Sequence, residues 1–160
     1  MREPVRVCFV CLGNICRSPT AEAVFARDVR SASLDEAFEI DSAGTGRWHV
    51  GERAHPETRR TAERHGLQIT HRARTFERAD FERFDWVLAM DLENWRALRA
   101  LARSESELEK LHLFRSFDPD APSAAEVPDP YLSGGFEGVF EICERASAGL
   151  LAHIRAVRAL

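Results

Sequence analysis

The chain has 160 residues, of which 44% are hydrophobic and 30% charged, and its net charge at pH 7 is −4. This length favours one domain spanning residues 1–160, the acidic balance disfavours a nucleic-acid-binding protein, and no apolar run reaches the ~20 residues of a membrane span. The N-terminal segment enters a strand-like run at once, which predicts no signal peptide. We therefore expect a cytoplasmic protein with reduced thiols.

Short apolar runs predict four buried strands, at residues 5–11, 38–45, 85–91 and 110–114. Amphipathic segments predict four helices, at residues 19–32, 56–66, 92–104 and 136–157. We expect Ser18 to be the N-cap of the first helix, Pro19 to be its first residue, and Gly66 to end the second helix. Strands that alternate with helices predict an α/β fold, with a mainly parallel sheet and helices on both faces.

A long segment, residues 115–135, joins the last predicted strand to the last helix and holds four of the seven prolines. Loops of this length inside a small domain are usually functional or disordered. In open parallel sheets, ligands bind at the carboxyl ends of the strands. Both this loop and residues 11–17 begin at such an end.

Three of the four cysteines, Cys8, Cys11 and Cys16, lie within the stretch VCFVCLGNICRSP, and Arg17 follows them. A metal site is disfavoured because these three thiols have no fourth ligand nearby and the histidines are scattered. A redox pair of Cys8 and Cys11 is disfavoured because Cys8 lies inside an apolar strand. We expect Cys8 and Cys143 to be small buried hydrophobic residues.

The remaining interpretation is a thiolate nucleophile at Cys11 in an anion-binding loop. The Cys-x5-Arg pattern is weak in an arginine-rich chain, but here it lies between a strand and a helix N-terminus, where backbone N–H groups converge on anions. Gly13 and Asn14 readily adopt unusual backbone angles. A helix N-terminus and Arg17 both favour a thiolate, and the guanidinium matches two phosphate oxygens. The loop therefore predicts attack on a phosphoryl group and a covalent phosphocysteine.

The stretch VCLGNICRSP resembles the phosphate-binding loop of the low-molecular-weight protein tyrosine phosphatases. Further stretches follow in that family's order: DSAGT (41–45), WHVG (48–51), HRAR (71–74), MDLEN (90–94) and DPY (129–131). The resemblance implies a four-stranded parallel sheet in three layers, with the phosphate-binding loop after the first strand. It implies a phosphatase without cofactor or metal, with phosphotyrosine proteins as substrates and inorganic phosphate as product. Neither nucleic acid nor a membrane is expected as a partner, and a monomer is favoured.

The resemblance also implies residue roles. Cys11 would be the nucleophile, Arg17 the phosphate clamp and Asp129 the general acid. Ser18 would hydrogen-bond the thiolate, while the loop would be supported by a side-chain network of Asn14, Ser42 and His71. The substrate would contact the loop and two aromatic walls, through Leu12, Gly13, Asn14, Ile15, Cys16, Ser18, Trp48 and Tyr131.

Several of these roles have alternatives. Asp118 precedes a proline as Asp129 does, and Asp-Pro is also a common turn former. Trp48 could be a packing residue and His71 an ordinary surface residue. Cys16 is either loop filler or a resolving thiol that forms a reversible disulfide with Cys11. Leu132 replaces the second tyrosine that often follows Asp-Pro in the family, which places regulation by phosphorylation there in doubt.

Three other functions compete with a tyrosine phosphatase. An arsenate reductase needs further cysteines to relay a disulfide, and only Cys143 follows Cys16. A phosphoarginine phosphatase is a nearer rival, although such relatives tend to place a threonine where this chain has Ile15. A non-catalytic phosphotyrosine-binding module is disfavoured because Cys11, Arg17 and Asp129 are all present.

Overall fold

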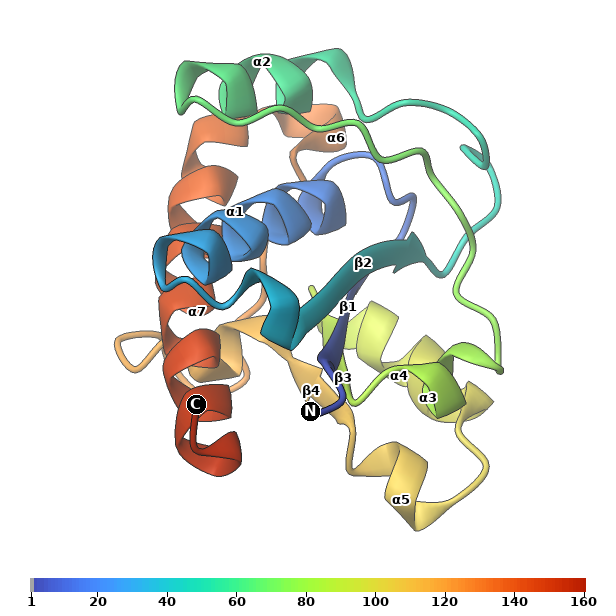
Figure 1. Ribbon diagram of the computed structural model, residues 1–160. Coiled ribbons are helices and arrows are strands. Elements are labelled where there is room, and N and C mark those ends of the chain that lie inside the picture. The colour runs from blue at the N-terminus through green and yellow to red at the C-terminus, as the bar shows by residue number, and fades with distance from the viewer. Residues whose placement is uncertain (1) are drawn as a thin grey trace.

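The computed structural model describes residues 2–160, which form one four-stranded parallel sheet flanked by helices (Figure 1). The strand order is β2-β1-β3-β4, and all three neighbouring pairs are parallel. The strands are β1 (Val5–Cys11), β2 (Phe38–Gly44), β3 (Trp86–Ala89) and β4 (Leu111–Leu113). The predicted α/β fold and the position of each predicted strand are therefore confirmed.

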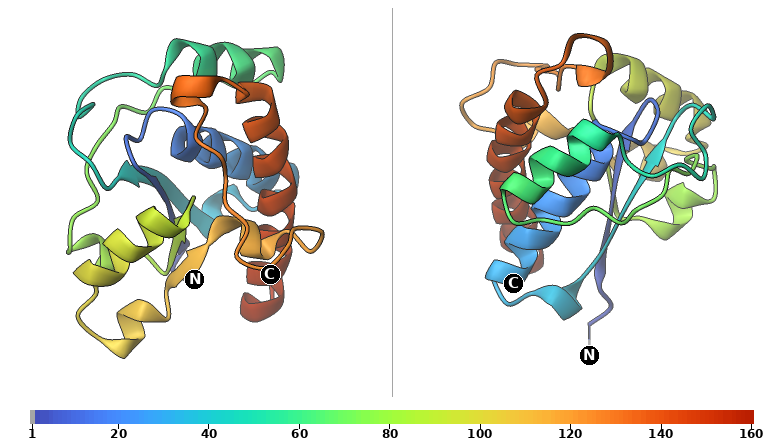
Figure 2. Two further views of the ribbon diagram at one scale, coloured as in Figure 1. Left: turned by 180° about the vertical axis from the view of Figure 1, so that it is seen from behind. Right: turned by 90° about the horizontal axis from the view of Figure 1, so that it is seen from above.

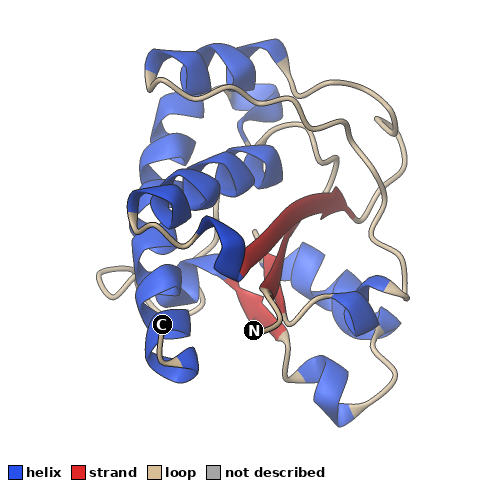
Figure 3. Cartoon of the chain, viewed as in Figure 1, coloured by secondary structure: helices blue, strands red, loops and turns tan. Residues whose placement is uncertain are grey.

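Helices cover both faces of the sheet, as predicted (Figures 2 and 3). One face carries α1 (Arg17–Ser31) and α7 (Phe136–Arg158), with α2 (Pro56–Arg64) packed on α7. The other face carries α3 (Asp80–Arg83) and α4 (Leu92–Leu101). The remaining short helices are η1 (Asp35–Ala37), α5 (Glu105–Leu108), η2 (Phe114–Phe117) and α6 (Pro130–Ser133). None of the helices in the described residues is long and apolar enough to cross a membrane.

The central strand β1 is buried on both sides. Val7 and Phe9 pack into the core beneath α1 and α7, whereas Cys8 and Val10 pack into the core beneath α3 and α4. This alternation follows from the two-residue period of a strand, and the two covered faces explain why β1 reads as a continuous apolar run. Cys8 is fully buried, as is Cys143 on α7, and burial raises the pKa of both thiols. Both are buried as predicted.

Two local predictions are wrong, and the shortest helices were not predicted. Helix α1 begins at Arg17 with Cys16 as its N-cap, so Ser18 lies inside the first turn and is not the cap. The segment predicted as loop 115–135 contains part of η2 and all of α6. Helices of three or four residues, such as α3 and α5, are too short to produce a hydrophobic period. Gly66 does follow the end of α2, with a left-handed φ of 77°.

Backbone hydrogen bonds bring three chain segments to the carboxyl edge of the sheet. Met90, just after β3, donates its N–H to the carbonyl of Val10 (3.1 Å) and accepts one from Val127 (2.8 Å). Thr45, just after β2, donates to the carbonyl of Cys11 (2.9 Å). The loop that carries Asp129 is thereby placed beside the end of β1.

Candidate active site

A cavity of about 130 Å³ opens at this carboxyl edge. A larger cavity, of about 290 Å³, lies behind the loop beside Glu22 and His71, but no cysteine lines it. The smaller cavity therefore contains the candidate chemistry. Its lining residues are Cys11, Leu12, Gly13, Ile15, Cys16, Arg17, Trp48, His49, Asp129 and Tyr131. All of them except His49 were predicted from the sequence to be site residues.

The loop after β1 turns its backbone toward the sulfur of Cys11. Asn14 has a left-handed φ of 57°, and its N–H donates to Cys11 Sγ (3.3 Å). Gly13 does not share this conformation, which corrects the expectation that both residues adopt unusual angles. Among residues 2–160, the N–H groups of Gly13, Ile15 and Cys16 find no acceptor. They remain available to an anion, as a nest of backbone amides does.

The side chain of Asn14 is the centre of a hydrogen-bond network behind the loop. Its Nδ2 donates to Ser18 Oγ (2.7 Å) and to Ser42 Oγ (3.0 Å). Its Oδ1 accepts from the backbone N–H of Arg74 (3.0 Å) and lies 2.7 Å from His71 Nε2. Because a backbone N–H can only donate, the amide oxygen must be on that side. His71 therefore carries a proton on Nε2 and donates it to Asn14.

The same orientation leaves the Ser18 hydroxyl proton free to be donated to Cys11 or to the carbonyl of Ala43. Ser18 Oγ accepts a hydrogen bond from Asn14, so its own proton is free for another acceptor. Cys11 Sγ lies 3.0 Å away, nearer than the carbonyl of Ala43 at 3.4 Å. A thiolate at Cys11 carries no proton, so in that state the hydroxyl of Ser18 and the N–H of Asn14 would both donate to the sulfur.

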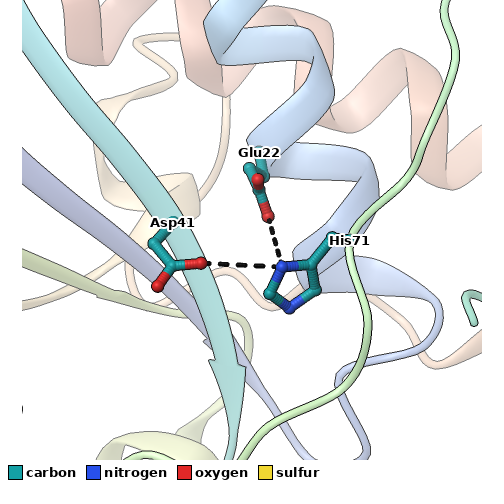
Figure 4. Close-up of side chains that lie close together, drawn as sticks. All are labelled: Glu22, Asp41 and His71. Carbon is teal, nitrogen blue, oxygen red and sulfur yellow. Dashed lines mark ion pairs between the residues drawn. The ribbon is translucent and has the colours of Figure 1, made fainter. Parts of the chain in front are cut away.

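Behind Asn14, the ring of His71 faces two carboxylates (Figure 4). Its Nδ1 lies 3.6 Å from an oxygen of Glu22 and 3.6 Å from an oxygen of Asp41. Burial raises the pKa of Glu22 to about 7 and lowers the pKa of His71. One ligand atom from each residue lies within 4.8 Å of the others, a spacing that could hold a metal ion. Glu22 also accepts a hydrogen bond from Ser42 Oγ (2.5 Å). Because Ser42 in turn accepts from Asn14, this cluster is connected to the loop by hydrogen bonds.

Arg17, the first residue of α1, is almost fully buried, and hydrogen bonds fix the position of its guanidinium group. Its Nη1 donates to Asp91 Oδ2 (2.7 Å) and to the carbonyl of Val127 (3.0 Å). Its Nη2 lies 3.6 Å from Asp129 Oδ2 at the cavity. Burial acts to lower the pKa of Arg17, but Cys11 and Asp91 outweigh it and raise that pKa. The guanidinium thus remains charged with one nitrogen facing the cavity.

The two Asp-Pro dipeptides lie in different places. Asp129 is the N-cap of α6, where its Oδ1 accepts from the N–H of Tyr131 (3.0 Å), and its side chain is 46% exposed. Asp118 is buried, forms an ion pair with Arg145 (3.5 Å) and does not line the cavity. The structure brings Asp129, and not Asp118, to Arg17 and Cys11.

Aromatic side chains form the mouth of the cavity. Trp48 is 74% exposed and Tyr131 is 48% exposed, so neither is a core residue. The indole of Trp48 lies against Gly46, where an added Cβ would come within 2.1 Å of the ring. The ring of His49 lies 5.8 Å from that of Tyr131. The segment 47–51 and helix α6 therefore meet across the mouth.

Three residues that the structure places at or behind the cavity were not predicted from the sequence. Asp91 anchors Arg17, Glu22 accepts from Ser42, and His49 lines the mouth. Asp91 could have been predicted from the sequence, because an acidic residue directly after β3 lies at the same edge of the sheet as the end of β1. Glu22 is an acidic residue on an otherwise apolar turn of α1, which is a weaker signal.

A buried cysteine and a buried arginine that line one cavity at the carboxyl edge of a parallel sheet are typical of a cysteine-dependent phosphatase. Comparison with known proteins identifies the family within this class. Residues 6–159 match the model of the family described as low molecular weight phosphotyrosine protein phosphatase. The chain belongs to this family.

Individual relatives agree with the family match. A low molecular weight protein-tyrosine-phosphatase of Streptomyces coelicolor is 52% identical over 153 residues, covering 94% of this chain and 93% of the relative. The crystal structure of YfkJ from Bacillus subtilis has a TM-score of 0.92 at 36% identity and covers 97% of each chain. A Drosophila arginine phosphatase has a TM-score of 0.86 at 31% identity, covering 93% of this chain and 97% of the other. This chain is a protein-tyrosine phosphatase, a phosphomonoester hydrolase.

Proposed function

We propose that Cys11 is the nucleophile and that the reaction passes through a phosphocysteine. The observation that carries the proposal is the position of Cys11 Sγ, which accepts from the N–H of Asn14, lies 3.0 Å from Ser18 Oγ and lines the same cavity as Arg17. The free amides of the loop and Arg17 would bind three phosphate oxygens, and the sulfur would attack phosphorus opposite the leaving oxygen. Water would then attack the phosphocysteine and release inorganic phosphate.

In this proposal Asp129 is the general acid. Its carboxyl would protonate the leaving phenolate oxygen in the first step and accept a proton from the attacking water in the second. The 46% exposure of Asp129 and its position at the mouth support this role, because the leaving group must point outward from the buried sulfur. Asp91 would be a positioning residue, since it contacts Arg17 from the side away from the cavity.

We propose further that phosphotyrosine is preferred over phosphoarginine. Trp48 and Tyr131 offer aromatic walls to a phenyl ring, while Ile15 offers an apolar contact and no hydrogen-bond partner for a guanidinium. The wild type should show a higher kcat/KM for a phosphotyrosine peptide than for the matched phosphoarginine and phosphoserine peptides. The variant Ile15→Thr should narrow the gap with phosphoarginine. Faster turnover of phosphoarginine than of phosphotyrosine by the wild type would overturn the proposed preference.

Cys16 is proposed as a resolving thiol for an oxidised Cys11. Peroxide would convert the Cys11 thiolate to a sulfenic acid, and the Cys16 thiolate would displace hydroxide to form a disulfide. Burial raises the pKa of Cys16 to about 12, so its thiolate is scarce at neutral pH. We therefore expect the rate of disulfide formation to rise about tenfold per pH unit between about pH 7 and 9. Mass spectrometry of the linked peptide measures this rate.

A thiol reductant should restore activity to the oxidised wild type and to Cys143→Ala, a control that removes another buried thiol. Cys16→Ser should instead become irreversibly inactive. Full recovery of Cys16→Ser would show that Cys16 does not resolve Cys11.

A further inference from the structure

The exposed apolar side chains of this protein are concentrated in one place. Among residues 2–160, the large apolar side chains that remain exposed are Leu12, Trp48, Val50, Tyr131, Leu132 and Val157. Leu12, Trp48 and Tyr131 line the mouth of the cavity. Val50 and Leu132 lie within two residues of these lining residues and are 56% and 93% exposed. We call these five residues, all but Val157, the apolar rim.

The apolar rim is held in place by the structure around it. The ring of His49, next to Trp48 and near Val50, lies 5.8 Å from that of Tyr131. Leu132 lies on α6, whose first turn is capped by Asp129. The most exposed residue of the rim is therefore three positions from the proposed general acid, on a backbone that the same acid holds.

We propose that the apolar rim binds an apolar side chain immediately next to the phosphotyrosine of the substrate, with Leu132 as the main contact. This inference rests on the proposed function of the cavity. A phosphotyrosine that reaches Cys11 leaves its own backbone at the mouth, so the adjacent side chains of the substrate lie over the rim. Three of the rim side chains line the cavity and the other two are their near neighbours in sequence. Exposed apolar side chains gathered at a cavity mark an interaction site, and covering them removes apolar surface from water.

A second copy of the chain is the other candidate occupant. A stable interface needs about 20–30 residues on each side, and the rim offers five side chains beside an open cavity. A short substrate segment that already enters the cavity needs only these few contacts. The rim therefore fits a peptide better than a folded partner.

The test compares phosphotyrosine peptides that carry leucine or serine directly before or directly after the phosphotyrosine. The wild type should prefer leucine in at least one of these positions, by about tenfold in kcat/KM and mainly through KM. Leu132→Ser should reduce the preference to less than about threefold, and Val50→Ser should reduce it by a smaller factor. Both variants should hydrolyse para-nitrophenyl phosphate, which has no flanking residue, as the wild type does.

Val157→Ser is the matched control, because Val157 is 60% exposed on α7 and lies outside the apolar rim. It should retain the full preference for leucine. Equal turnover of leucine and serine peptides by the wild type, or an unchanged preference in both Leu132→Ser and Val50→Ser, would overturn the inference and leave the proposed function intact. A wild-type dimer that Leu132→Ser converts to a monomer would assign the rim to a second copy and overturn it too. Failure of the wild type to hydrolyse para-nitrophenyl phosphate would overturn the proposed function, and the inference with it.

Discussion

Cys11→Ser is expected to lower kcat by roughly 10⁴-fold or more, the order of loss seen when a hydrolase loses its covalent nucleophile. The sulfur of Cys11 is held by the N–H of Asn14 and the hydroxyl of Ser18 in an arrangement that stabilises negative charge. A serine hydroxyl at the same position keeps its proton at neutral pH, because Cys11 Sγ contacts no base among residues 2–160. The measurement is the turnover of para-nitrophenyl phosphate, with a phosphocysteine trapped by rapid acid quench in the wild type alone.

Anion binding separates loss of the nucleophile from loss of the site. The free amides of the loop and Arg17 remain in Cys11→Ser, so inorganic phosphate should bind within a few-fold of its wild-type affinity. Cys143→Ala, which removes a buried thiol on α7, should retain turnover. Activity above a few per cent of the wild type in Cys11→Ser, in a sample free of wild-type protein, would contradict the covalent mechanism.

The architecture could be predicted from the sequence because apolar residues recur along each long strand or helix in the pattern that is typical of that element. β1 reads as an apolar run because both of its faces are covered, and α7 carries an apolar stripe along 23 residues. The first turn of α1 could not be placed in the same way. Ser18-Pro19 is a good N-terminal signal, but the anion-binding loop requires Ser18 inside the helix, where its hydroxyl reaches Cys11.

The chemistry of the candidate site could be read from residue types only where its residues are close in sequence. Distant site residues such as His71 and Asp129 were predicted through the family resemblance alone, and no role was predicted for Asp91 or Arg74. Residues 11–18 form one motif, and their chemistry follows from residue types and from the strand and helix that flank them. The partners of Arg17 and Asn14 come from distant segments: Asp91 after β3, and His71 and Arg74 before α3. Only the three-dimensional register of the sheet brings those segments together.

Asp129→Ala is expected to slow hydrolysis of phenyl phosphate by roughly 10²–10⁴-fold, the usual contribution of general acid catalysis. Substrates with a good leaving group, such as para-nitrophenyl phosphate, should be slowed much less, because their leaving oxygen needs little protonation. Asp118→Asn is the matched control: it changes the other Asp-Pro dipeptide, which is buried away from the cavity. A dependence on the leaving group in Asp118→Asn, and none in Asp129→Ala, would assign the acid to Asp118.

The alanine variant removes two functions at once, because Asp129 also caps α6 through the N–H of Tyr131. Asp129→Asn separates them: the amide oxygen still accepts that hydrogen bond, whereas the amide cannot supply a proton to the leaving group. If Asp129 acts as the acid, Asp129→Asn should be as slow as Asp129→Ala on phenyl phosphate. If Asp129→Asn instead keeps the wild-type rate, the loss in Asp129→Ala comes from a displaced Tyr131 and not from a missing proton.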